Sequence, residues 1–91
     1  MENRVLRYFL AIVSEGNLTS AAKLLHITQP TLSRQIKELE EELSVMLFNR
    51  KGKYMELTRE GYYLANKARD IITLVDQTTS SIKHKEVYGE V

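Results

Sequence analysis

The side chains best suited to chemistry in this sequence are hydrogen-bonding groups at the start of a predicted helix near residue 30. Arg34 can donate two parallel hydrogen bonds to the edge of a guanine, and Gln29 can pair in a similar bidentate way with an adenine. The ring of Pro30 and the methyl group of Thr31 can pack on the methyl group of a thymine. These residue types at this spacing indicate readout of base edges in the major groove of duplex DNA.

Three further polar side chains in the same segment are better placed for phosphate groups. The hydroxyls of Thr28 and Ser33 and the ammonium group of Lys37 can bind phosphate oxygens, contacts that fix the register of a protein on DNA. The Gln29-Pro30 pair also has a simpler explanation, because Pro is common in the first turn of any helix. The case for DNA recognition therefore depends on the elements that position these groups.

Length and composition exclude several classes of protein. The sequence has 91 residues, of which 43% are hydrophobic and 27% are charged, as is typical of one small globular domain. It contains no Cys, which excludes a disulfide framework and a thiolate zinc site. No apolar run approaches the roughly 20 residues needed to cross a bilayer, and Met1–Phe9 has no hydrophobic signal core. We therefore expect a cytoplasmic protein without a membrane partner.

The net charge of +1 gives no argument for nucleic acid, but the charges are unevenly distributed. Residues 1–37 contain five basic and two acidic side chains, residues 38–47 contain four acidic and no basic ones, and residues 48–59 contain four basic and one acidic. If the two basic zones meet in space, they form a local positive patch that the average hides. The alternative is that these charges lie on solvated helix faces.

The spacing of apolar residues predicts three short helices. Residues 3–15 form the first helix, which ends at Gly16, and residues 18–25 form the second. Thr28 caps a third helix after a break of three or four residues, and Pro30 fits its first turn. The inward stripe of this third helix consists of Leu32, Ile36, Leu39 and Leu43.

A hairpin and one long helix complete the chain. Phe48–Arg50 and Tyr54–Leu57 bracket a basic turn that contains Gly, which predicts a small β-hairpin. From Arg59 to about Ile82 no Pro interrupts a coiled-coil-like repeat, and this length gives a helix of about 36 Å, longer than a small domain needs. We expect part of it to pair with a second copy, although the whole helix could instead fold back on its own domain. The predicted dimer seam comprises Leu64, Ala68, Ile71, Val75, Thr78 and Ile82.

Together these elements predict a mainly α fold: a winged helix-turn-helix of three helices and a two-stranded β wing, followed by a long dimerisation linker helix. The expected boundaries are 1–58 for the winged helix-turn-helix, 59–85 for the linker helix and 86–91 for a hinge. The acidic groups of the third helix would repel phosphates if the helix lay flat in a groove. Its amino-terminal end, which carries the positive end of the helix dipole, must therefore point into the groove. These acidic groups are Glu38, Glu41 and Glu42.

The segment from Ala21 to Gly61 resembles the DNA-binding domain of the LysR-type transcriptional regulators, a large bacterial family of ligand-responsive activators and repressors. The resemblance begins at Leu6-Arg7-Tyr8-Phe9 and covers essentially the whole chain. Two positions depart from the family pattern: Thr28 replaces the usual Ser and keeps the hydroxyl, and Ser44 replaces the usual Gly after the third helix. The other matching motifs are Ala21-Ala22, Gln29-Pro30, Leu32-Ser33, Gln35-Ile36, Leu39-Glu40, Leu47-Phe48-Asn49-Arg50 and Leu57-Thr58.

The resemblance implies a set of DNA contacts. It implies that Arg50 contacts the DNA backbone and that the wing, at Lys51 and Lys53, reaches a minor groove. The residues implied to contact the operator from the third helix are Thr28, Gln29, Pro30, Thr31, Ser33 and Arg34.

The resemblance also implies the partners of the chain. They are a pseudo-palindromic DNA duplex and a second copy of the chain, with a tetramer of the longer protein and RNA polymerase as further candidates. No cofactor or metal is expected. A small-molecule effector would act only through a ligand-binding domain beyond the hinge at 86–91, which this chain does not contain.

Three other functions fit the sequence less well. An enzyme would need partners for His26 and His84, which stand alone, or a phosphate-binding loop, which the four glycines do not form. No catalytic residue is therefore expected. A winged helix used only for protein contacts would have an apolar face where this sequence has Gln, Thr, Ser, Arg and Lys. A general nucleoid-binding protein would be strongly basic rather than nearly neutral.

Overall fold

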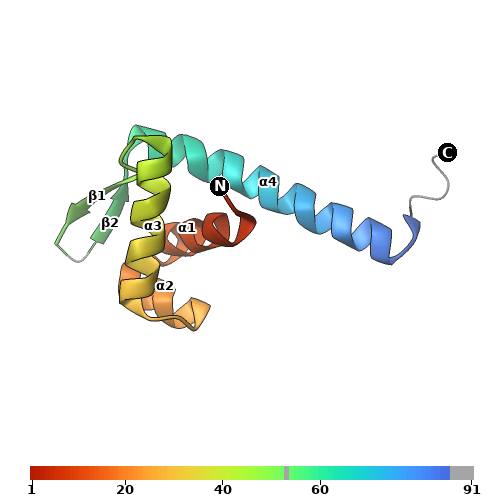
Figure 1. The fold of residues 1–91 in the computed structure, drawn as a ribbon, viewed down its shortest axis with the longest axis horizontal. Helices are drawn as coiled ribbons and strands as arrows, with labels where there is room; N and C mark the ends of the chain where they lie inside the picture. The colour runs from red at the N-terminus through yellow and green to blue at the C-terminus, as the bar shows by residue number, and fades with distance from the viewer. Residues whose placement is uncertain (53, 87–91) are drawn as a thin grey trace.

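A computed structural model describes residues 1–52 and 54–86, and its elements follow the order expected from the sequence. The predicted fold class is confirmed, since three short helices and a two-stranded antiparallel sheet precede one long helix. Of the hinge expected at 86–91, residues 87–91 lie outside the described residues. In chain order the elements are α1 (Asn3–Glu15), α2 (Leu18–Leu25), α3 (Gln29–Leu43), β1 (Phe48–Lys51), β2 (Tyr54–Leu57) and α4 (Arg59–Lys83) (Figure 1).

The ends of the short helices are fixed by backbone conformation and side-chain caps. Gly16 ends α1 in the left-handed region, with φ of 79°, which a residue without a Cβ enters at little cost. The side chain of Asn17 accepts a hydrogen bond from the N–H of Ser20 at 2.8 Å and so caps α2. Thr28 caps α3 by accepting from the N–H of Thr31 at 3.2 Å. These caps allow α1, α2 and α3 to follow one another through very short turns.

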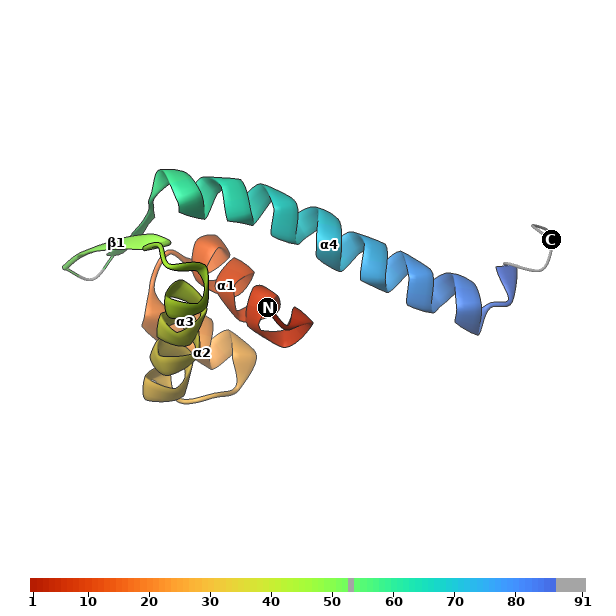
Figure 2. The same ribbon diagram turned by 45° about the horizontal axis from the view of Figure 1, so that its top comes forward.

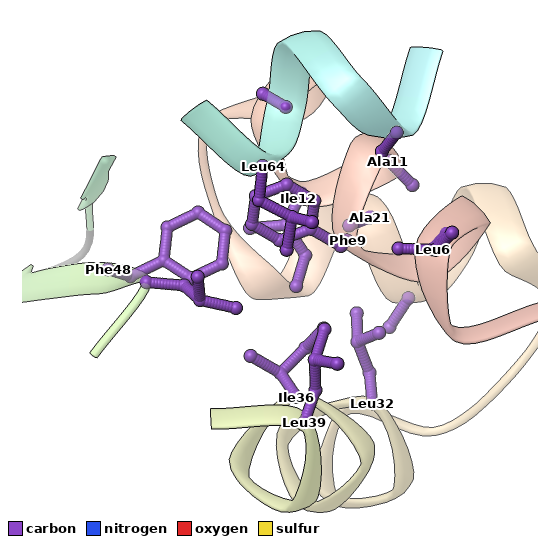
Figure 3. Close-up of a cluster of buried hydrophobic side chains, with 14 residues drawn as sticks. Leu6, Phe9, Ala11, Ile12, Ala21, Leu32, Ile36, Leu39, Phe48 and Leu64 are labelled. Carbon is purple, nitrogen blue, oxygen red and sulfur yellow. The ribbon is translucent and has the colours of Figure 1, made fainter. Parts of the chain in front are cut away.

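One hydrophobic core joins the helices to the first strand. In Figure 3 the side chains of Phe9 and Ile12 from α1 meet Ile36 from α3, with Phe48 of β1 on one side and Leu64 of α4 above them. The rings of Phe9 and Phe48 are 5.3 Å apart with their planes tilted by 50°, within the range that aromatic pairs favour. The predicted inward stripe of α3 is confirmed, because three of its members are buried and the fourth is half-buried against the same core. The opposite side of α3 must therefore face outward.

The hairpin is slightly tighter than the sequence predicts. Phe48 pairs with Leu57 and Lys51 pairs with Tyr54, so β1 is one residue longer than expected. Gly52 begins the turn with φ of 62°, a left-handed conformation that suits Gly. The hairpin projects from the end of the molecule where α3 meets the start of α4 (Figure 1).

The start of α4 is packed tightly against the segment that leads into the hairpin. The hydroxyl of Thr58 accepts from the N–H of Gly61 at 3.0 Å and donates to the carbonyl of Met46 at 2.7 Å. A Cβ at Gly61 would clash with the carbonyl oxygen of Leu47, so Gly allows this close approach. The direction in which α4 leaves the domain is therefore set by these contacts.

The two halves of α4 have different surroundings (Figure 2). Leu64 and Ala68 in the first half are 8% and 0% exposed and belong to the core of their own chain. This corrects the predicted dimer seam, because side chains buried in this core do not face a second copy. The core also extends beyond the domain boundary expected at residue 58. In the second half, Leu74 and Ile82 are 64% and 60% exposed, so the alternative in which the whole helix folds back is wrong.

An ion pair links α1 to the second half of α4. The guanidinium of Arg7 in α1 lies 2.7 Å from the carboxylate of Asp76. Although α4 has 25 residues, no helix in the described part of the chain has an apolar stretch long enough to cross a membrane.

Ser44 stands at the position where the sequence departs from the expected Gly. It ends α3 in the left-handed region, with φ of 57° and ψ of 33°. A residue with a Cβ pays about 1–2 kcal/mol for this conformation, whereas Gly does not. The left-handed backbone at the end of α3 therefore explains why Gly is the usual residue at this position in the family pattern. In this chain the same conformation leaves Ser44 locally strained.

Replacing Ser44 with Gly should therefore stabilise the fold. We expect Ser44→Gly to raise the free energy of unfolding by about 0.5–1 kcal/mol, since relief of strain exceeds the added entropy of the unfolded chain. Urea denaturation measures this change. Ser44→Ala is the control, because it keeps the Cβ and should give no gain. Equal stabilisation by both variants would show that the backbone conformation is not the cause.

Candidate nucleic-acid interface

The first turns of α3 present polar side chains on the outer side of the helix. None of the seven residues predicted for this helix belongs to the hydrophobic core, and they gather at its amino-terminal end. Thr31 and Ser33 are half-buried. The remaining five, which are exposed, are Thr28, Gln29, Pro30, Arg34 and Lys37.

The two threonines at the helix start are engaged with each other. The hydroxyl of Thr28 donates to the hydroxyl of Thr31 at 2.8 Å while it accepts from the N–H of Thr31. The Thr31 hydroxyl keeps its own proton, which it can donate outward. Thr28 is therefore chiefly a structural cap, and Thr31 is the better placed of the two to reach a ligand.

Arg34 is exposed on the side of α3 opposite the buried Leu32 and Ile36. Its side chain is 64% exposed, and its Nε lies 4.0 Å from Glu38 one turn further along α3. An exposed ion pair of this length contributes about 0–1 kcal/mol, so it restrains Arg34 only weakly. The guanidinium can leave Glu38 for a base edge or a phosphate at little cost.

A cleft of about 660 Å³ lies between the helix-turn-helix and the hairpin. Thr19 from α2 and Gln29 from α3 line one part of it, and Arg50 and Tyr54 from the hairpin line another. Tyr54 is 71% exposed and was not identified from the sequence, although alternation along β2 places it outward. Thr19 was missed as well, because nothing in its own neighbourhood indicates a partner ten residues away.

Arg50 is held by a buried carboxylate. Glu40 is 5% exposed, and one of its oxygens accepts from the backbone N–H groups of Leu47 and Phe48 at 2.7 and 3.4 Å. Its other oxygen lies 3.4 Å from the guanidinium of Arg50, which is itself 35% exposed. The carboxylate thus connects α3 to the base of the hairpin and orients Arg50.

The burial of Glu40 was not predicted from the sequence. Its position contained a usable signal, because it follows Ile36 by four residues and so continues the buried side of α3. Two other basic groups were predicted for the wing. Lys53 and the side chain of Lys51 lie outside the part of the chain that the structure describes.

The second half of α4 carries the remaining residues of the predicted seam. Ile71 and Val75 are half-buried, whereas Thr78 and Ile82 are exposed. These side chains continue the stripe that is buried against α1 in the first half of the helix. Beyond the domain the stripe has no cover from the described part of the chain.

In residues 1–52 and 54–86, no three His, Asp or Glu side chains lie together in an arrangement that could hold a metal ion.

Comparison with known proteins agrees with this architecture. The model of the family described as bacterial regulatory helix-turn-helix protein, lysR family, matches residues 3–62. The HTH-type transcriptional regulator BsdA of Bacillus subtilis (strain 168) is 53% identical over 92 residues, which cover 98% of this chain and 32% of BsdA. The HTH-type transcriptional regulator BenM of Acinetobacter baylyi (strain ATCC 33305 / BD413 / ADP1) is 46% identical over 83 residues, which cover 91% of this chain and 27% of BenM. The chain thus spans about a third or less of the length of these relatives.

Solved structures align with nearly the whole chain. The crystal structure of a CbnR DBD–DNA complex gives a TM-score of 0.89 at 37% identity and covers 94% of this chain and 99% of that one. A complex of the BenM DBD with catB site 1 DNA gives a TM-score of 0.89 at 45% identity, covering 92% of this chain and 93% of that one. Full-length BenM gives 0.86 at 46% identity, with 91% of this chain and 27% of that one covered.

The role of Glu40 can be tested by removing its carboxylate. We expect Glu40→Ala to lower the free energy of unfolding by about 2–3 kcal/mol, because two buried N–H groups lose their acceptor and Arg50 loses its partner. Glu40→Gln, which keeps one oxygen for the N–H of Leu47, should lose about 1 kcal/mol. Urea denaturation of both variants measures the difference. A Glu40→Ala variant as stable as the unmodified chain would contradict this assignment.

Proposed function

The chain belongs to the bacterial LysR family of regulatory helix-turn-helix proteins, and on that premise we propose that it binds duplex DNA sequence-specifically to regulate transcription. The observation that carries the proposal is the amino-terminal end of α3, where exposed hydrogen-bonding side chains occupy the end of the helix that can enter a major groove. The structural relatives solved as DNA complexes support it.

The first turns of α3 enter the groove in this proposal, with the carboxyl end of the helix tilted away. Arg34 reads guanine and Gln29 reads adenine, while Ser33 and Lys37 bind phosphates. The exposed carboxylates of Glu38, Glu41 and Glu42 support this orientation, because they lie nearer the other end of the helix, where approach to phosphates costs energy.

The wing is proposed to contact DNA beside the recognition helix. Arg50, Lys51 and Lys53 supply its positive charge, with Lys51 and Lys53 in a minor groove and Arg50 at the backbone. The ion pair between Glu40 and Arg50 supports a positioning role for the Glu40 carboxylate, because an oriented guanidinium loses less entropy when it binds a phosphate.

A second copy of the chain is the proposed partner of α4. The stripe that runs from the half-buried Val75 to the exposed Thr78 and Ile82 supports this, because an apolar face that leaves its own domain gains by pairing with another. A dimer offers two recognition helices at a fixed separation to a pseudo-palindromic duplex. The resemblance to the LysR-type regulators also suggests a tetramer of the longer protein and contact with RNA polymerase, and both stay proposals.

The proposed DNA-binding activity also bears on enzymatic activity, cofactors, location in the cell and effector sensing. The relatives are transcriptional regulators, and we infer a regulator rather than an enzyme, with no catalytic residue and no cofactor. Binding to a bacterial chromosome would take place in the cytoplasm. Sensing of a small-molecule effector, which the resemblance places in a separate domain, is not a function that we propose for these 91 residues.

Removal of the Arg34 side chain tests base readout. After selection of the preferred duplex from random sequences, Arg34→Ala should weaken binding to it by about 1–3 kcal/mol and leave binding to random duplex unchanged. Arg34→Lys is the matched control, because it keeps the charge but loses the fork that makes two parallel hydrogen bonds. If Arg34→Lys keeps the full sequence preference, Arg34 contacts a phosphate and not a base.

Disruption of the uncovered stripe tests the dimer. Ile82→Asp should give monomers in sedimentation and a large loss of affinity for the selected duplex, because the two half-sites are no longer bound together. Gln77→Asp adds the same charge to an exposed position about 140° around the helix and should change neither property. An Ile82→Asp variant that stays dimeric would place the dimer contact elsewhere.

A further inference from the structure

The side chain of Gln29 has a partner on the neighbouring helix. The hydroxyl of Thr19 in the first turn of α2 lies 3.1 Å from the side-chain oxygen of Gln29 at the start of α3, with the Thr Oγ1 as donor. Both residues are exposed, and both line the cleft that separates the helix-turn-helix from the hairpin. The contact therefore lies on the surface that faces DNA in the proposed function, and not in the core.

The backbones that carry the two side chains are fixed independently of this hydrogen bond. The Asn17 cap holds the first turn of α2, and the Thr28 cap holds the first turn of α3. His26 ends α2 in the left-handed region, and the N–H of Ile27 donates to the carbonyl of Ala22 at 3.1 Å. The hydroxyl of Thr19 is thus presented to Gln29 by a rigid turn, and removal of the hydroxyl leaves that turn intact.

Gln29 is a long side chain that would otherwise rotate freely at the surface. A hydroxyl can donate to the amide oxygen or accept from the amide nitrogen, so the contact restrains Gln29 whichever way its amide is turned. Recognition of adenine needs the oxygen and the nitrogen of the amide in one plane, directed at the base edge. A side chain held near that position loses less conformational entropy when it binds.

We infer that Thr19 is a positioning residue for sequence readout: its hydroxyl holds the Gln29 carboxamide in place for one base pair of the operator. The inference rests on the proposed function and refines it by naming a residue outside α3 that determines specificity. Within the described residues, Thr19 is the one side-chain hydrogen-bond partner of Gln29. The other hydroxyls of the helix start, on Thr28 and Thr31, are bonded to each other.

The experiment measures base preference one position at a time. The preferred duplex is selected from random sequences with the unmodified chain, and each base pair is then replaced by the other three in competition binding. Gln29→Ala should lose discrimination at one position. Thr19→Val, which keeps the shape of the side chain without the hydroxyl, should lose about 3- to 10-fold of the discrimination at that same position. Its affinity for random duplex should not change.

Two matched variants separate positioning from other roles. Thr19→Ser keeps a hydroxyl and should restore discrimination to that of the unmodified chain. The double variant Thr19→Val/Gln29→Ala should behave like Gln29→Ala alone, because Thr19 acts through Gln29. Thermal unfolding followed by circular dichroism checks that each variant is folded, and Thr19 contributes nothing to the buried core that would make folding fail.

The inference and the proposed function fail in different ways. Equal loss of affinity for every duplex in Thr19→Val would show that Thr19 binds a phosphate, and this would overturn the inference alone. Unchanged discrimination in either Thr19→Val or Gln29→Ala would also overturn it while the chain still prefers one duplex. An unmodified chain that prefers no duplex would overturn the proposed function and the inference together.

Discussion

The packing of α3 against the core determines how the proposed DNA-binding groups of this helix are oriented. Burial of Leu32, Ile36 and Leu39 in the core, where α3 packs mainly on α1 and α2, fixes the rotation of the helix about its axis. Once this side is turned inward, Arg34 must face outward, because it lies on the opposite side of the helix. Gln29 lies on the same side as Leu32 but is exposed, because it is the first residue of the helix. The same rotation that buries the apolar stripe therefore also exposes the polar face, so a change that loosened the core would disorient every group proposed to contact DNA.

The contacts around Glu40 and Gly61 extend this constraint to the wing and to the long helix. Glu40 connects the buried side of α3 with the backbone that leads into β1, and Gly61 lets α4 begin directly against the carbonyl of Leu47. Recognition helix, hairpin and the start of α4 thus meet around one short segment, residues 46–48. In the proposed dimer, the separation of two recognition helices would follow from this junction, because α4 leaves each domain in a fixed direction.

The sequence predicts most of this fold, because its helix ends have local causes. Gly16, Asn17, Thr28 and Thr58 act through residues no more than four positions away, and such spacing is visible in a sequence. Contacts between residues far apart in the sequence could not be predicted in this way. The burial of Glu40, the Thr19–Gln29 hydrogen bond and the division of α4 into a covered and an uncovered half depend on how elements pack, which periodicity does not specify. The predicted seam erred at Leu64 and Ala68 for this reason, since a dimer face and a core face have the same apolar spacing.

In the proposed complex, two copies joined through α4 place the first turns of their α3 helices in major grooves on one side of a duplex. Methylation interference on the selected duplex can detect this arrangement, because methylation of guanine N7 blocks contacts in the major groove. We expect two symmetric clusters of interfering guanines, separated by about one helical turn of 10 base pairs or by a whole multiple of it. A single cluster, or binding that guanine methylation does not affect, would contradict this arrangement.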